Sequence, residues 1–277
     1  MYDKCMKDLS NENVIQLDKN GLSYLQFKKL SEYPEIYHLF SLKPADIAAL
    51  STWEEKKESA LADVRNMRMV LDAEDADVCR PCQTHSDHIK TVEAEDAGIY
   101  DASFEDTDGL VTGLPGKFLL LGFGDCTPLL FYDPVHAAVG NIHSGWRGTC
   151  QRIGAKAVKA MEDAFGSKPA DLICCIAPHI RKCHFEVDED VYLLFRNEFT
   201  DFADFEKYVR FEPERNKYYI DTTALNIRML ENAGLKPDNI IDSGICTVCH
   251  SDMVHSYRAD KAASGRSAAV IGLKMKP

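Results

Sequence analysis

The sequence predicts a mixed α+β (mixed α/β) fold, organised as a single domain over residues 1–277. Short apolar runs of strand length fill the middle of the chain, each closed by Gly, Pro or Asp or by a polar cluster. Segments with apolar residues at helical spacing are interleaved with them, without the strict alternation of a doubly wound sheet, so mixed sheets are favoured. No internal repeat, low-complexity tract or linker divides the chain, and its length suits one mixed α/β domain.

The N-terminal part begins with a predicted hairpin. Residues 14–17 and 22–27 are expected to be strands, because Asn20-Gly21 between them is a strong turn signal. Residues 54–71 follow as a predicted amphipathic helix. Its apolar stripe is assigned to the core and consists of Ala60, Leu61, Val64, Met67 and Leu71.

The remaining elements lie in the middle and C-terminal parts of the chain. Apolar runs predict buried strands at residues 118–123, 129–132, 137–142, 172–176 and 268–273. Helical spacing predicts helices at residues 151–165, 188–199 and 222–233. Gly234 follows the last of these helices and is expected to close it as a C-cap.

Composition and charge exclude several classes of partner. The formal net charge is −12 and there is no basic run, which argues against nucleic acid and against an anionic membrane surface. The N-terminal residues lack the apolar core of a signal peptide, and no stretch approaches the roughly 20 apolar residues that span a bilayer. We therefore expect a cytoplasmic protein whose ten cysteines are free thiols or metal ligands. Cys174 and Cys175, inside an apolar run, are expected to be buried as small hydrophobic residues.

Three polar or glycine-rich segments are the candidates for chemistry: residues 83–88, 124–128 and 143–149. Two of them directly follow predicted strands, where strands fix side chains and loops expose them. They contain His85, Cys126 and His143, a thiolate and two imidazoles that together suit zinc or copper. Three protein ligands leave a fourth position open, as in catalytic zinc sites. From spacing alone, a histidine near a strand end is more often a hydrogen-bonded polar residue than a metal ligand.

A series of motifs resembles, in order, the laccase-domain family, also called the multicopper polyphenol oxidase family. The motifs are QTHSDHI (83–89), DGLVTGLPG (108–116), GDCTPLLFYDP (124–134), HSGWRGT (143–149), APHIRKCHFEV (177–187) and CTVCHSDMVHSYR (246–258) with SGR (264–266). The resemblance runs from about residue 83 to the C-terminus. Members of this family have been reassigned as purine nucleoside phosphorylases.

The resemblance implies a fold, a metal and an activity. Its implied fold is a four-layer α/β/β/α arrangement, in a cytoplasmic enzyme. Its implied zinc ligands are His85, Cys126 and His143, with copper as the other metal to consider. The implied substrates are purine nucleosides (adenosine, inosine and methylthioadenosine) with phosphate, and adenosine deamination is an accompanying activity. Those three residues would then also be catalytic.

Phosphorolysis requires cationic side chains to hold the phosphate. Arg147 and Arg258 are our candidates, because a guanidinium matches phosphate in a bidentate geometry. Pairing of Arg147 with a local carboxylate or carbonyl is the equally weighted alternative. Asp87 is expected either to orient a metal-bound histidine or transfer protons, or to cap a helix or turn.

The chain departs from the family pattern in three places. The N-terminal part, about residues 1–80, has Phe40-Ser41-Leu42-Lys43-Pro44 in place of a motif with paired glycines, which puts a pocket wall or phosphate contact in doubt. The usual Cys-Tyr-Glu-Val reads His184-Phe185-Glu186-Val187, with Cys183 one position earlier. Ala259 stands where the family has a second arginine.

Other classes of function remain alternatives. One is a copper-dependent polyphenol oxidase (laccase), disfavoured because nine histidines without a His-x-His repeat are few for several copper centres. Another is a hydrolase of cell-wall precursors with Cys126 as nucleophile and His143 as base. A third is a non-enzymatic module with a zinc ion held by Cys79-x-x-Cys82 and Cys246-x-x-Cys249. The preferred substrate, the physiological metal and the oligomeric state do not follow from the sequence.

Overall fold

The computed structural model describes residues 8–51, 54–99 and 104–275, and over these residues it confirms the mixed α+β fold. Two mixed six-stranded sheets form its centre. The first has the order β1 (Val14–Lys19), β2 (Leu22–Phe27), β3 (Ile36–Ser41), β15 (Ser267–Leu273), β7 (Lys117–Phe123) and β4 (Asp77–Cys79). The second has the order β14 (Ile240–Asp242), β10 (Ile173–Ile176), β8 (Thr127–Asp133), β9 (Ala138–Ser144), β6 (Gly109–Thr112) and β5 (Ile89–Thr91).

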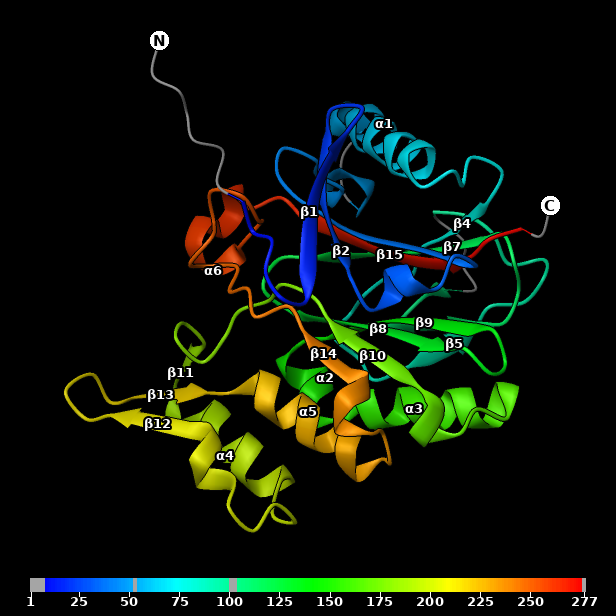
Figure 1. The fold of residues 1–277 in the computed structure, drawn as a ribbon. Helices are drawn as coiled ribbons and strands as arrows, with labels where there is room; N and C mark the ends of the chain where they lie inside the picture. Colours follow the sequence, from blue (N-terminus) through cyan, green and yellow to red (C-terminus); the bar gives the residue numbers. More distant parts are fainter. Residues whose placement is uncertain (1–7, 52–53, 100–103, 276–277) are drawn as a thin grey trace.

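The two sheets face each other and carry helices on their outer faces, which makes four layers (Figure 1). Helix α1 (Glu54–Val70) covers the first sheet. Helices α2 (Trp146–Cys150), α3 (Ile153–Phe165) and α5 (Thr222–Asn232) lie against the second. The expected four-layer α/β/β/α arrangement is therefore confirmed.

Alternation of side chains along each strand builds the layers. In β7, Leu119 and Leu121 pack between the sheets, whereas Phe118 and Leu120 pack beneath α1. Both faces of the strand are buried, so its sequence is a continuous apolar run. The neighbouring Cys174 and Cys175 follow the same rule: one packs with the helices and the other between the sheets, and both are fully buried as expected.

Locally encoded elements occur where the sequence predicts them. In the first hairpin Asn20 and Gly21 have φ of 54° and 77°, as a tight two-residue turn requires. Gly234 has φ of 102° directly after α5 and its cap residue. The helix predicted from residue 151 starts only at Ile153, because Arg152 has φ of 61° and separates α3 from the short α2.

The N-terminal part shares a sheet with the C-terminal strand. β3 pairs with β15 in antiparallel register, Ile36 opposite Leu273 and Phe40 opposite Ala269. The segment that departs from the family pattern is thus built into the main sheet. Among the described residues no helix combines the length and the apolar character that crossing a membrane requires.

A smaller unit projects from one end of the second sheet (Figure 1). It comprises α4 (Glu189–Glu198) and a three-stranded sheet of β11 (Glu186–Val187), β13 (Lys217–Ile220) and β12 (Val209–Glu212). Aromatic side chains dominate its core, among them Phe195, Phe199 and Phe205. The last helix, α6 (Tyr257–Asp260), precedes β15 and is capped by the Ser256 side chain.

Candidate metal centre and substrate cavity

The candidate centre forms where the chain crosses from one sheet to the other. β7 ends at Phe123 in the first sheet and β8 begins at Thr127 in the second, so Cys126 lies on the crossover. β8 and β9 are antiparallel, with Pro128 opposite His143. The start of β8 and the end of β9 therefore meet at one sheet edge, which places Cys126 beside His143.

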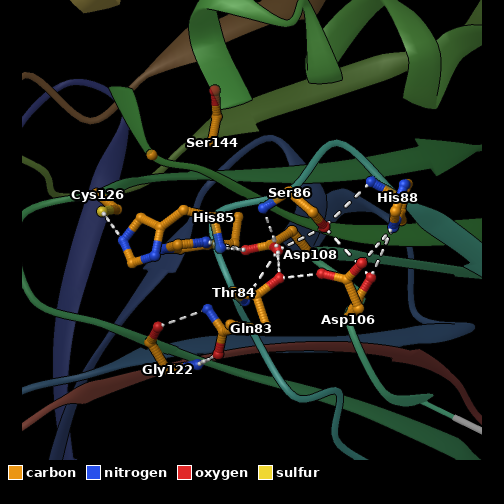
Figure 2. A network of polar contacts seen from close by, with 12 residues as sticks. Gln83, Thr84, His85, Ser86, His88, Asp106, Asp108, Gly122, Cys126 and Ser144 are labelled. Atoms are coloured by element: carbon orange, nitrogen blue, oxygen red, sulfur yellow. Dashed lines mark hydrogen bonds and ion pairs between the residues drawn. The ribbon is translucent and has the colours of Figure 1, made fainter. Parts of the chain in front are cut away.

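The side chains of His85, Cys126 and His143 converge in the structure. Their donor atoms lie within 4.8 Å of one another, and His85 Nε2 is 3.7 Å from Cys126 Sγ (Figure 2). In a tetrahedral zinc site, bonds of about 2.1 Å to nitrogen and 2.3 Å to sulfur separate neighbouring N and S donors by about 3.6 Å. The three residues thus fit one zinc ion with a fourth position open. Their assignment as ligands stays a prediction.

Asp108 organises this centre, and it is the first residue of the DGLVTGLPG motif. Its buried carboxylate accepts hydrogen bonds from the backbone N–H groups of Thr84 (3.1 Å), His85 (3.1 Å) and Ser86 (2.8 Å), as Figure 2 shows. It also lies 2.6 Å from His143 Nδ1. With Nδ1 engaged, His143 presents Nε2 to the centre, which is how a carboxylate fixes the tautomer of a metal-binding histidine.

Cys126 and His143 each shift the pKa of the other towards its charged form. Burial by itself raises the pKa of the Cys126 thiol, but the charge of His143 and hydrogen bonds from both histidines outweigh burial and lower this pKa to about 6. Burial likewise lowers the pKa of His143, but the charges of Cys126 and Asp108 overcome it and raise this pKa to about 9. In the metal-free protein Cys126 is therefore a thiolate at neutral pH, the form that binds metals.

Two non-glycine residues beside the centre adopt left-handed backbone conformations, His85 with φ of 64° and Asp125 with φ of 88°. The Asp108 carboxylate stabilises the left-handed conformation of His85, because it accepts a hydrogen bond from the His85 N–H. The Asp125 carboxylate anchors the second, because it accepts hydrogen bonds from Thr247 Oγ1 (2.5 Å), Ser256 Oγ (2.7 Å) and the Arg258 N–H (2.5 Å). Unfavourable backbone conformations that are held in place by several hydrogen bonds are typical of functional sites.

Gly145 allows the three candidate ligands to approach the backbone. A Cβ atom at this position would lie 2.8 Å from His85 Cδ2 and 3.3 Å from Cys126 Sγ. The glycine of the His-Ser-Gly-Trp-Arg-Gly motif therefore leaves room for the ligand side chains themselves.

The centre lines a cavity of about 770 Å³, within the size range of small-molecule binding sites. Ile47, Leu50, Phe185 and Tyr257 contribute apolar and aromatic surface. Two of these, Ile47 and Leu50, come from the N-terminal segment, so this divergent part does supply a wall. Lys43 of the same segment is engaged elsewhere, 3.0 Å from the Asp260 carboxylate.

The two candidate phosphate-binding arginines have different environments. Arg147 is exposed, its guanidinium lies over the Trp146 ring at 4.2 Å, and it does not line this cavity. Arg258 does line it. The Arg258 guanidinium donates to the carbonyls of His184 (2.8 Å) and Glu186 (3.1 Å), and with five N–H donors it retains others for an anion.

Arg80 and Arg266 also line the cavity, and sequence reasoning missed both as candidates. Arg266 donates to the Gly265 carbonyl at 2.9 Å. It belongs to the closing Ser-Gly-Arg motif, which was the available signal. Asp87, in contrast, forms an ion pair with Lys156 of α3, and the orienting position beside His143 belongs to Asp108.

Comparisons with known proteins find relatives over most of the chain. The chain is 35% identical over 196 residues to the purine nucleoside phosphorylase YlmD of Bacillus subtilis (strain 168), covering 69% of each protein. It is 31% identical over 205 residues to adenosine deaminase RL5 of an unknown prokaryotic organism, covering 73% of this chain and 77% of the relative. The crystal structure of Bacillus licheniformis hypothetical protein YfiH superposes with a TM-score of 0.82 at 28% identity, covering 92% of this chain and all of that one.

A family model extends the resemblance to the N-terminal part, beyond the motifs that begin near residue 83. It is described as multi-copper polyphenol oxidoreductase laccase, and it matches residues 4–274. Since this match includes the divergent segment as well as the three converging motifs, the chain belongs to the multi-copper polyphenol oxidoreductase laccase family.

Proposed function

We propose that this chain is a zinc-dependent purine nucleoside phosphorylase that acts on adenosine, inosine and methylthioadenosine in the cytoplasm, with adenosine deaminase activity at the same site. The observation that carries the proposal is the convergence of His85, Cys126 and His143 at the wall of the 770 Å³ cavity. Relatives named purine nucleoside phosphorylase and adenosine deaminase support the substrate class.

The residues of the cavity suit the two parts of a phosphorolysis reaction. The aromatic rings of Phe185 and Tyr257 offer surfaces for a purine base. Arg258 and Arg266 would hold phosphate, and their place on the cavity wall favours them over Arg147. An oxygen of hydrogen phosphate attacks the anomeric carbon as the glycosidic bond breaks, and the departing base takes up the proton that the phosphate loses. His85, Cys126 and His143 would hold the zinc ion, which would supply Lewis-acid chemistry.

The chain's own residues prepare the centre for this chemistry. Asp108 holds His143 in one tautomer and fixes the backbone on both sides of His85. The Gln83 side chain exchanges two hydrogen bonds of 2.9 Å with the Gly122 backbone and attaches the same loop to β7. The donors are thus rigid before a substrate enters, which is the condition for efficient electrostatic catalysis.

Product analysis tests the proposal. Purified protein of measured zinc content is incubated with adenosine or inosine, with and without phosphate, and bases and ammonia are quantified. We expect phosphate-dependent release of free base, and ammonia from adenosine. His85→Ala protein purified identically controls for host enzymes. If zinc-loaded protein yields neither product, the substrate assignment is wrong, and phenols and cell-wall precursors are the next substrates to test.

The alternative of a cysteine hydrolase is favoured by one observation, the lowered pKa of Cys126 beside His143. We expect iodoacetamide to alkylate Cys126 rapidly in metal-free protein at pH 7, because the thiolate reacts. The rate should fall as the pH is lowered through about 6, where the thiolate is protonated. Zinc should protect Cys126, as peptide mass spectrometry would show. Inactivation of the zinc-loaded enzyme without zinc release would instead support the nucleophile.

A further inference from the structure

A second cluster of soft ligands lies outside the candidate centre. Cys183 and His184 stand on the segment between β10 and β11, and Cys246 and Cys249 on the turns that follow β14. The donor atoms of all four residues lie within 4.8 Å of one another. Sequence spacing pairs Cys246 and Cys249 with Cys79 and Cys82. In the structure, their partners are instead Cys183 and His184.

Backbone hydrogen bonds hold the two segments together. The Thr247 N–H donates to the His179 carbonyl (3.1 Å), and the His179 N–H donates to the Ile245 carbonyl (3.3 Å). These bonds form a short parallel bridge, His179 to Cys246. The proximity of the four side chains therefore follows from the fold of the backbone.

The distances within the cluster match a tetrahedral metal site. Cys183 Sγ lies 3.5 Å from Cys246 Sγ and 3.9 Å from Cys249 Sγ. His184 Nδ1 lies 3.2, 3.7 and 3.5 Å from the sulfur atoms of Cys183, Cys246 and Cys249. Zinc bonds of about 2.3 Å to sulfur and 2.1 Å to nitrogen predict about 3.8 Å between sulfur atoms and about 3.6 Å between sulfur and nitrogen.

We propose that Cys183, His184, Cys246 and Cys249 form a second, structural zinc site. Three thiolates and one imidazole make a closed four-ligand shell, whereas the first centre has three protein ligands and an open position. A disulfide would use only two of the thiols and would leave the third thiol and the imidazole unexplained. Soft thiolate donors also exclude magnesium and calcium, which bind oxygen ligands.

The second site would stabilise the wall of the substrate cavity. Ile180 and Phe185, on either side of Cys183 and His184, line the cavity. The His184 carbonyl accepts a hydrogen bond from Arg258 (2.8 Å). Thr247, between the two C-terminal cysteines, donates to the Asp125 carboxylate next to Cys126 (2.5 Å). A metal bound by Cys183, His184, Cys246 and Cys249 would thus hold the two loops together. It would stabilise the wall of the substrate cavity, which is hydrogen-bonded to the first centre through Thr247 and Asp125.

Metal counting on the full chain tests the site. Protein purified with a thiol reductant and dialysed against zinc is analysed for zinc and protein content. We expect two equivalents in the wild type and one in either His184→Ala or the double variant Cys183→Ser/Cys249→Ser. His250→Ala is the matched control, since His250 is another half-buried histidine of the same region and is not a donor. It should retain two equivalents.

Replacement of zinc by cobalt distinguishes the two sites by their absorption spectra. Cobalt bound to thiolates absorbs strongly in the near-ultraviolet, so most of this band should arise from the site with three cysteines. Most of the band should survive in His85→Ala, whereas the double serine variant should keep only the smaller part that arises from Cys126. A single zinc equivalent that disappears in His85→Ala would overturn the proposal. So would a disulfide between Cys183 and Cys246 or Cys249 in freshly purified protein that holds no second zinc. Neither result would affect the product assay above.

Discussion

Replacement of His85 by alanine is expected to remove one equivalent of metal and to lower turnover of purine nucleosides by at least about 10²-fold. A bound metal ion contributes several kcal/mol to transition-state stabilisation, and about 2.7 kcal/mol corresponds to this factor. His85 is exposed and its ring extends towards Cys126 (Figure 2), so its removal should leave the fold intact. Zinc analysis and initial rates measure the two effects.

His88→Ala is the matched control for this variant. His88 is also an exposed histidine, three positions along the same loop, but it contacts Asp106 through Nδ1 at 3.0 Å and is not one of the three converging donors. It should retain both the metal and wild-type rates. If His85→Ala kept its metal and turned over at the wild-type rate, His85 would not be a ligand and the centre would need another third donor.

Replacement of Asp108 by asparagine is expected to weaken zinc binding at the first centre by about 10- to 100-fold, the range for groups that orient metal-bound histidines. It should also lower the free energy of unfolding by about 2–4 kcal/mol. One carboxylate oxygen accepts from His143 and the His85 N–H, and the other from Thr84 and Ser86. An amide has one acceptor oxygen, so its NH₂ group must face buried donors in either orientation.

Competition with a chromophoric chelator and urea unfolding of the metal-free protein separate these two effects. Asp106→Asn is the control, because Asp106 is exposed and lies on the same loop. Its carboxylate contacts Thr84 and His88. Exposed pairs contribute about 0–1 kcal/mol, so this variant should resemble the wild type. Unchanged zinc affinity in Asp108→Asn, despite reduced stability, would restrict Asp108 to a structural role.

Much of the candidate site could be predicted from the sequence because its three converging donor residues belong to short motifs. His85, Cys126 and His143 each stand in a segment whose residue types indicate a strand end or a polar loop. The arginines could not be ranked in this way. Arg147 is part of a specific motif yet stacks on Trp146 at the surface, whereas Arg266 reaches the cavity from a motif close to the C-terminus.

The local elements could be predicted from neighbouring residues alone. The Asn20-Gly21 turn, the α1 stripe and the end of α5 at Gly234 all depend on residues within one or two turns of each other. Apolar runs also identified the central strands β7, β8 and β9. These features follow from backbone preferences and side-chain periodicity, which neighbouring residues are sufficient to define.

The pairing of distant segments, in contrast, depends on how the whole chain folds. The crossover between sheets places Cys126 beside His143, and pairing of β6 with β9 places Asp108 at the same imidazole. The bridge at His179 likewise brings Cys183 and His184 to Cys246 and Cys249. Strand register and sheet assignment depend on packing across the whole core, which local sequence does not specify. Which donor side chains converge at each candidate metal site is therefore a property of the fold, although the individual donors can be recognised along the chain.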